Sequence, residues 1–148
     1  MIYHAFLIKY AEIAIKGKNR YLFEDALVKQ MNIALSAVEG DFSVVKEQGR
    51  IYVFCPEEYD YEDTVAALKR VFGIVYICPV VIYEDQGFDQ MAKDVVSYMQ
   101  ACHPGYAGTF KVYTRRAKKS YPIPSMEVSA KLGGSILDAF PEARVDVH

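Results

Sequence analysis

The chain has 148 residues, which is enough for one domain of ordinary size or two small ones. Hydrophobic residues make up 52% of it, which excludes a disordered chain, and no apolar run approaches the roughly 18 residues of a membrane-spanning helix. The formal net charge is −2, so a strongly basic stretch on this chain is a local concentration of charge.

The first half of the chain predicts the order β-α-β-β-α-β, which is the ferredoxin-like pattern. Residues 2–10 are apolar at nearly every position, as is typical of an interior strand. The expected elements that follow are a helix from an Asn19 cap to about Glu39, strands over 41–46 and 51–54 joined by a turn at Gly49, a helix over 62–72 and a strand over 74–78. We expect Pro79 to interrupt strand pairing, and the first domain to cover residues 1–78.

Residues 79–148 predict a second, smaller α/β unit. Its expected elements are a helix over 88–101, a strand over 109–114, a turn stiffened by Pro122 and Pro124, and a helix that Ser125 caps and that ends near Pro141. Residues 145–148 look like the opening of another strand, and a sheet of this size normally has more strands. We therefore expect the chain to be a fragment, with the second domain incomplete at its C-terminus.

The most informative feature is the basic segment, residues 111–121. Five of the seventeen Lys and Arg residues lie in it, namely Lys111, Arg115, Arg116, Lys118 and Lys119, and no Asp or Glu occurs between Thr109 and Met126. Phosphate backbones are the commonest partners of such a patch, since each neutralised phosphate releases a counterion. We expect Ser120 and the N–H groups at the start of the following helix to add phosphate contacts. The alternative is a solvated charged loop.

A second basic stretch, Lys16, Lys18 and Arg20, precedes the first predicted helix. An anion can bind at such a helix N-terminus, although the spacing does not match a P-loop. Taken alone, this stretch fits a solvated loop better than an anion site. An enzyme that used it to act on an anionic substrate would lack a base and a nucleophile.

Two glycines, Gly133 and Gly134, lie inside the last predicted helix, where each costs about 1 kcal/mol relative to Ala. Close packing of this helix on the sheet is one explanation, and close approach of an RNA backbone is the other. The sequence leaves both open.

No catalytic or metal-binding motif is evident. Cys55, Cys78 and Cys102 are more than twenty residues apart, which matches neither a zinc site nor a redox pair, and we expect them to be buried thiols. The chain opens on a strand-like segment without a signal peptide, which favours the cytoplasm. We expect no catalytic residue, metal or cofactor within these residues.

Two separated blocks resemble the tRNA 4-thiouridine synthase family, also called the thiamine-biosynthesis tRNA sulfurtransferases (ThiI). The first block is Leu7–Arg20. The second runs from Phe110 through Arg115–Pro122 to Ser125–Glu127, and the stretches 132–134, 137–138 and 145–148 extend it. One departure is Ala11, where Gly is expected in the family.

The resemblance implies an α+β protein in which a ferredoxin-like domain is followed by a THUMP domain, and the two together bind tRNA near its acceptor end. In the family, a further domain uses ATP and Mg²⁺ to adenylate a uridine, and a cysteine desulfurase supplies the sulfur. The motifs of that domain have no counterpart here. The oligomeric state stays open, as does the choice between thiolation and thiamine synthesis.

The other hypothesis is a ferredoxin-like regulatory or protein-interaction module that does not bind nucleic acid, because this fold serves many functions. It predicts that the two basic stretches point in unrelated directions. RNA binding predicts that they share a face.

Overall fold

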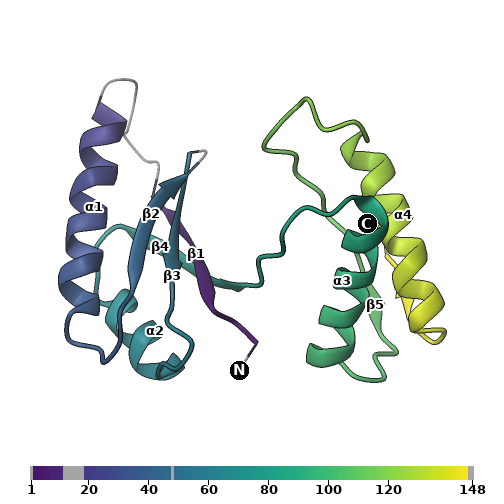
Figure 1. The fold of residues 1–148 in the computed structure, drawn as a ribbon, viewed down its shortest axis with the longest axis horizontal. Helices are drawn as coiled ribbons and strands as arrows, with labels where there is room; N and C mark the ends of the chain where they lie inside the picture. Colours follow the sequence, from purple (N-terminus) through teal and green to yellow (C-terminus); the bar gives the residue numbers. More distant parts are fainter. Residues whose placement is uncertain (1, 12–18, 48, 147–148) are drawn as a thin grey trace. The chain divides into compact units, whose positions relative to one another are not determined.

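The computed structural model describes residues 2–11, 19–47 and 49–146. The chain divides into two compact units, Met1–Ile82 and Tyr83–His148, which are described separately below (Figure 1). Within the described ranges, every helix is too short or too polar to cross a membrane.

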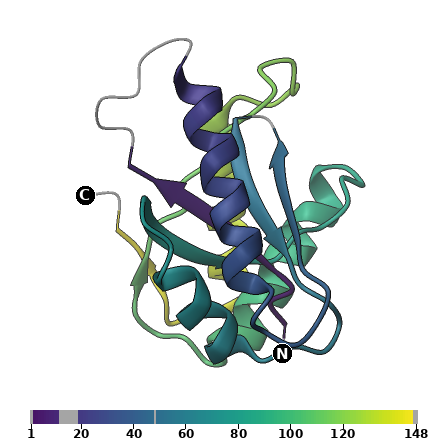
Figure 2. The same cartoon turned by 90° about the vertical axis from the view of Figure 1, so that its left-hand side faces the viewer.

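The first unit is a four-stranded antiparallel sheet with two helices on one of its faces (Figures 1 and 2). Its elements are β1 (Ala5–Tyr10), α1 (Arg20–Leu35), β2 (Ser43–Glu47), β3 (Arg50–Phe54), α2 (Tyr61–Lys69) and β4 (Ile74–Val80). The strand order is β2-β3-β1-β4, and each strand is antiparallel to its neighbours. This arrangement confirms the predicted ferredoxin-like fold.

The core of the first unit lies between the sheet and its two helices. Phe6 and Ile8 alternate along β1, and Leu27, Met31 and Leu35 recur every fourth residue along α1. All five are buried, and burial of one such side chain stabilises the fold by about 1.5–3 kcal/mol relative to leaving it exposed. The apolar strand and the amphipathic helix that the sequence predicts therefore build this core.

The expectation that Pro79 ends strand pairing is wrong. Pro79 lies within β4 and is paired with Phe6 of β1. β4 is at the edge of the sheet, and an edge strand tolerates proline because half of its N–H groups face away from the neighbouring strand.

The helix ends of the first unit differ in detail from those expected. α1 ends at Leu35 rather than near Glu39, because the chain continues in tighter turns, as in the 3.3 Å bond from the Ala37 N–H to the Ala34 carbonyl. Asn19 occupies the N-cap position, but its side chain makes no capping hydrogen bond. α2 is capped by Asp60, whose carboxylate accepts the Asp63 N–H at 2.8 Å.

The second unit contains α3 (Phe88–Cys102), β5 (Thr109–Phe110), α4 (Ser125–Ala139) and β6 (Arg144–Val145). β5 and β6 pair in parallel, and α3 packs against α4. Ile136 of α4 forms the buried centre with Phe140, the residue that follows the helix, and Ala143, and Val95 and Met99 of α3 pack against it.

Two expectations for this unit are wrong. Among the described residues, the strand expected over 109–114 covers only two residues, which pair with Arg144 and Val145 of β6, and the Asp146 N–H donates to the Phe110 carbonyl at 2.8 Å. Ser125 is not the helix cap. It is the first residue of α4, Pro124 holds the cap position, and no side chain caps this end.

Candidate nucleic-acid interface

The first half of the basic segment alternates between exposed and half-buried side chains, as an extended chain does. The exposed residues are Lys111, Tyr113 and Arg115, and the half-buried ones are Val112, Thr114 and Arg116. Val112 packs against the core of the second unit, and the Ser129 hydroxyl of α4 donates to the Thr114 hydroxyl at 2.7 Å. The inner side chains thus anchor the segment to α4, while the outer cations face solvent.

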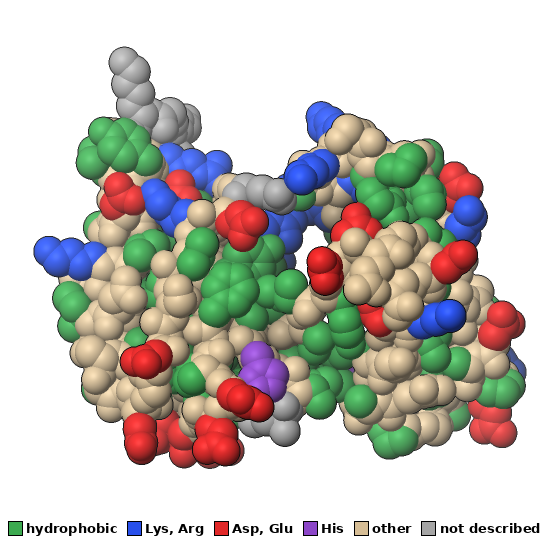
Figure 3. Space-filling model, viewed as in Figure 1, with side chains coloured by type: hydrophobic (Ala, Val, Ile, Leu, Met, Phe, Trp, Pro, Cys, Tyr) green, Lys and Arg blue, Asp and Glu red, His purple; other side chains and the backbone are tan. Residues whose placement is uncertain are grey.

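The second half of the basic segment forms a turn. Lys118, Lys119 and Ser120 are exposed, and the Tyr121 N–H donates to the Lys118 carbonyl at 3.1 Å. Arg116 reaches across this turn, where its Nη1 donates to the Tyr121 carbonyl at 2.9 Å. Figure 3 shows Lys and Arg side chains over the light-green loop that precedes α4 in Figure 1.

Four cations of the basic segment have no carboxylate partner within the part of the chain that the structure describes. They are Lys111, Arg115, Lys118 and Lys119. By contrast, Lys131 of α4 pairs with Glu127 at 3.3 Å and lies over the Phe88 ring at 5.5 Å. The four exposed cations therefore form a region of uncompensated positive charge that suits a polyanion.

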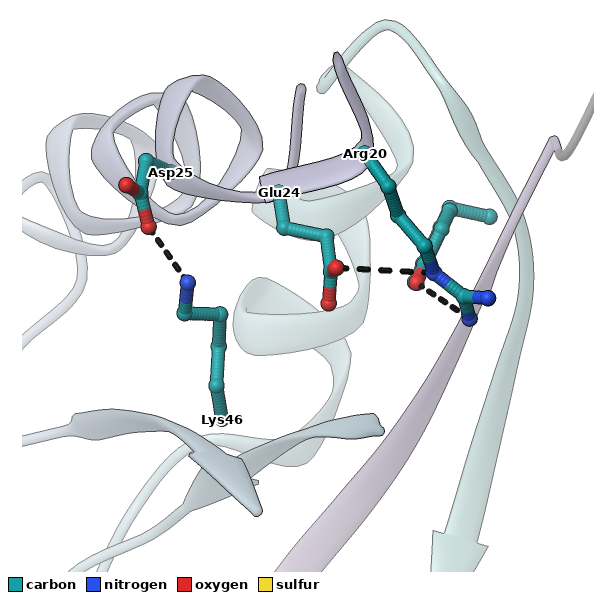
Figure 4. Close-up of polar contacts among 5 residues, drawn as sticks. Arg20, Glu24, Asp25 and Lys46 are labelled. Atoms are coloured by element: carbon teal, nitrogen blue, oxygen red, sulfur yellow. Dashed lines mark hydrogen bonds and ion pairs between the residues drawn. The ribbon is translucent and has the colours of Figure 1, made fainter. Parts of the chain in front are cut away.

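Arg20, the described member of the second basic stretch, is engaged within its own unit (Figure 4). Its Nε lies 3.5 Å from Glu24 Oε1, and its Nη2 donates to the Tyr10 hydroxyl at 3.2 Å. Beside this pair, Asp25 of α1 accepts a hydrogen bond from Lys46 of β2, which raises the pKa of that lysine. Lys16 and Lys18 lie outside the described residues.

The two glycines of α4 have no close neighbours at their Cβ positions. A Cβ atom added to Gly133 or Gly134 has no heavy atom of the described chain within 4 Å, apart from its own neighbours and helix backbone. Contact at the Cβ position therefore does not account for either glycine in the described structure. Gly133 is buried, whereas Gly134 is exposed, so the approach of an external backbone is an explanation for Gly134 alone.

The three cysteines are thiols with half-buried side chains, whereas buried ones were expected. Burial raises the pKa of the Cys55 thiol to about 11, although a hydrogen bond with Tyr59 opposes the shift. Since the thiolate is the reactive form, Cys55 is a poor nucleophile at neutral pH. No three potential metal ligands cluster among the described residues.

One surface feature was not anticipated from the sequence. A hollow of about 370 Å³ lies on the first unit between α1 and the end of α2, and its lining includes Ile33, Ala34 and Phe72. The Phe72 side chain is 98% exposed. Phe72 follows the turns that end α2 and precedes Gly73, which has a φ of 102°. Such a surface is what a protein-interaction module requires.

Comparison with known proteins assigns both units. Residues 5–78 match the model of the ThiI ferredoxin-like domain, and residues 85–148 match the THUMP domain. The chain is 56% identical over 147 residues to a probable tRNA sulfurtransferase of Agathobacter rectalis, which covers 99% of this chain and 37% of the relative. The corresponding protein of Coxiella burnetii is 37% identical over 143 residues, 96% of this chain and 36% of the relative. The chain thus spans little more than a third of the length of these relatives.

Two solved structures share the fold. PH1313 from Pyrococcus horikoshii superimposes with a TM-score of 0.78 at 28% identity, over 97% of this chain and 47% of the other. A 4-thiouridine synthetase in complex with RNA and bound ATP superimposes with a TM-score of 0.75 at 28% identity, over 99% of this chain and 36% of the other. The chain therefore belongs to the ThiI family, in which a ThiI ferredoxin-like domain is followed by a THUMP domain.

Proposed function

We propose that this chain is the tRNA-docking region of a tRNA 4-thiouridine synthase. Residues 1–78 are its ferredoxin-like domain, and residues 79–148 are its THUMP domain. The observation that carries the proposal is the set of exposed cations of the basic segment that lack a carboxylate partner among the described residues. The likeness to a 4-thiouridine synthetase solved with RNA supports the identity of the polyanion.

The extended half of the basic segment suits a chain of phosphates better than a single anion. Lys111 and Arg115 are four residues apart on the same side of the segment, which corresponds to about 13 Å at the 3.3 Å rise of an extended chain. They therefore contact different phosphates. Between them lies the ring of Tyr113, 83% exposed, on which an unpaired base can stack. RNA is recognised here by its backbone and by unpaired nucleotides rather than by groove reading.

The sulfur-transfer chemistry belongs to the remainder of the longer protein. The 4-thiouridine synthetase of similar structure binds ATP, and this chain covers 36% of that protein. We infer that ATP, Mg²⁺ and a cysteine desulfurase act with that remainder, in the cytoplasm. The role of the present residues is to position and orient the tRNA. Binding energy from a site remote from the chemistry can lower the reaction barrier in this way.

Binding of an unmodified tRNA transcript to the 148-residue chain tests the proposal. Fluorescence anisotropy between 50 and 300 mM salt should give an affinity that falls steeply with salt, since the contacts are ionic. A DNA hairpin of equal length and charge is the control and should bind more weakly, because it lacks the RNA shape and 2′-hydroxyls. Absence of tRNA binding at 50 mM salt would refute the proposal and favour the protein-interaction module, for which the exposed hollow around Phe72 is the candidate surface.

A further inference from the structure

Arg116 differs from the other cations of the basic segment in the direction of its side chain. Arg115 is exposed, whereas Arg116 lies on the half-buried side of the alternating stretch, with Val112 and Thr114. Both of these inner neighbours anchor the segment to the second unit, Val112 through the apolar core and Thr114 through Ser129. Arg116 therefore lies on the same half-buried side of the segment as the two residues that anchor it.

The guanidinium of Arg116 is used inside the loop. Nη1 donates to the Tyr121 carbonyl at 2.9 Å and to the Lys119 carbonyl at a longer 3.4 Å. Together with the bond from the Tyr121 N–H to the Lys118 carbonyl at 3.1 Å, these contacts close residues 116–121 into a ring. A charged donor to a backbone carbonyl is among the stronger hydrogen bonds of an exposed loop.

The loop needs such a closure because its other cations repel each other. Arg115, Lys118 and Lys119 are exposed, and no carboxylate pairs with them in the described ranges. Without the hydrogen bonds from Arg116, repulsion between these cations would favour many open conformations of the loop. Ordering the loop when a ligand binds would then cost free energy and weaken binding. A side chain that ties the two ends of the turn together removes most of that loss before binding.

We propose that Arg116 is a positioning residue that holds the turn 116–121 in its binding shape, with Lys118 and Lys119 facing outward, and that Arg116 itself neutralises no phosphate. The proposal rests on the tRNA-docking function proposed above. It replaces the expectation that all five cations of the segment contact phosphate.

Neighbouring arginines provide matched variants. Arg116→Lys and Arg116→Gln are compared with Arg115→Lys and Arg115→Gln, in the 148-residue chain with the tRNA transcript over the same salt range. Lysine keeps the charge, but its ammonium lies at the end of a flexible stem and is not held in the planar direction from which Nη1 of Arg116 reaches the Tyr121 and Lys119 carbonyls. We expect both Arg116 variants to bind about 10-fold more weakly with a salt slope within about 0.3 of the parent. We expect Arg115→Lys to bind nearly as the parent does, and Arg115→Gln to lower the slope by about 0.7–0.9.

Amide hydrogen exchange of the RNA-free chain measures directly how well Arg116 stabilises the turn 116–121. The N–H groups of residues 117–121 should exchange several-fold faster in both Arg116 variants and at the parent rate in the Arg115 variants, with α3 and α4 unchanged in all of them. Unchanged exchange at 117–121 overturns the proposal, and so does a slope lowered by 0.7 or more in Arg116→Gln. Failure of the docking function is recognised separately, because a parent chain that does not bind tRNA leaves the exchange result intact.

Discussion

Removing the exposed charges of the turn and its flank should weaken RNA binding by a calculable amount. The variant is Arg115→Gln, Lys118→Gln and Lys119→Gln combined. All three side chains are exposed, none pairs with a carboxylate among the described residues, and none belongs to a core cluster. Glutamine keeps much of the length of each side chain and its hydrogen-bonding capacity. The change is therefore one of charge, and stability should change by less than about 0.5 kcal/mol.

The magnitude follows from counterion release. Each lost phosphate contact lowers the slope of log K against log salt by about 0.7–0.9, so three contacts lower it by about 2.1–2.7. Extrapolated from 1 M salt, one contact changes the affinity by a factor of about 3.8 to 5.5 at 0.15 M, so the loss of three contacts weakens binding roughly 50- to 170-fold. At 1 M salt, the parent and the variant should converge.

The assay is fluorescence anisotropy of a labelled tRNA transcript at five salt concentrations. The matched control is Lys29→Gln, Lys69→Gln and Lys93→Gln combined, which removes the same charge from exposed positions outside the basic segment. We expect this control to lower the slope by less than 0.5. If both triple variants lose the same slope, the effect is one of net charge, and the assignment of the basic segment as the phosphate-binding surface is refuted.

Three further predictions concern stability. Arg20→Gln should destabilise the first unit by about 0.5–1 kcal/mol in urea unfolding, since it removes the ion pair with the 12%-exposed side chain of Glu24; an unchanged midpoint would contradict this. Gly134→Ala should stabilise the second unit by about 0.5–1 kcal/mol, because its Cβ meets open space, and a simultaneous loss of tRNA affinity would favour RNA approach to α4; a lower melting temperature would exclude the open-space interpretation. Stability should fall as pH rises from 9 through about 11, because folded Cys55 keeps its proton to a higher pH than the unfolded chain does; Cys55→Ala should remove that part of the fall.

Much of the fold could be predicted from the sequence because the signals are periodic. The apolar run of β1 and the four-residue repeat of α1 place Phe6, Ile8 and Met31 in one core. The pairing of Pro79 was not predicted. A proline interrupts a strand that has a neighbour on each side but is tolerated in an edge strand, and β4 is an edge strand. The length of β5 likewise depends on its partner β6, thirty-five residues further along the chain.

The sequence predicts where the candidate site lies in the chain, but it does not predict which of the basic side chains face solvent and which bind within the loop. Charge counting located the basic segment, because five cations with no nearby acid stand out on an acidic chain. It treated Arg115 and Arg116 as equivalent, since adjacent arginines look alike in a sequence. The structure separates them, because Arg115 lies on the exposed side of the segment and Arg116 donates to the Tyr121 carbonyl.

The salt dependence of RNA binding depends on how many of the cations assigned from the sequence have side chains that are not already bound within the protein. Six of the cations assigned to RNA lie in the described residues, and two of them are arginines whose guanidinium groups bind within their own unit: Arg20 to Glu24 and Tyr10, and Arg116 to its own loop. Four exposed cations remain. At about 0.7–0.9 per contact, they contribute a slope of about 2.8 to 3.6, whereas six would contribute about 4.2 to 5.4. A measured slope well above 3.6 would therefore require contacts from Lys16 and Lys18, or release of the two internal arginines, and the Arg20→Gln and Arg116→Gln variants distinguish these sources.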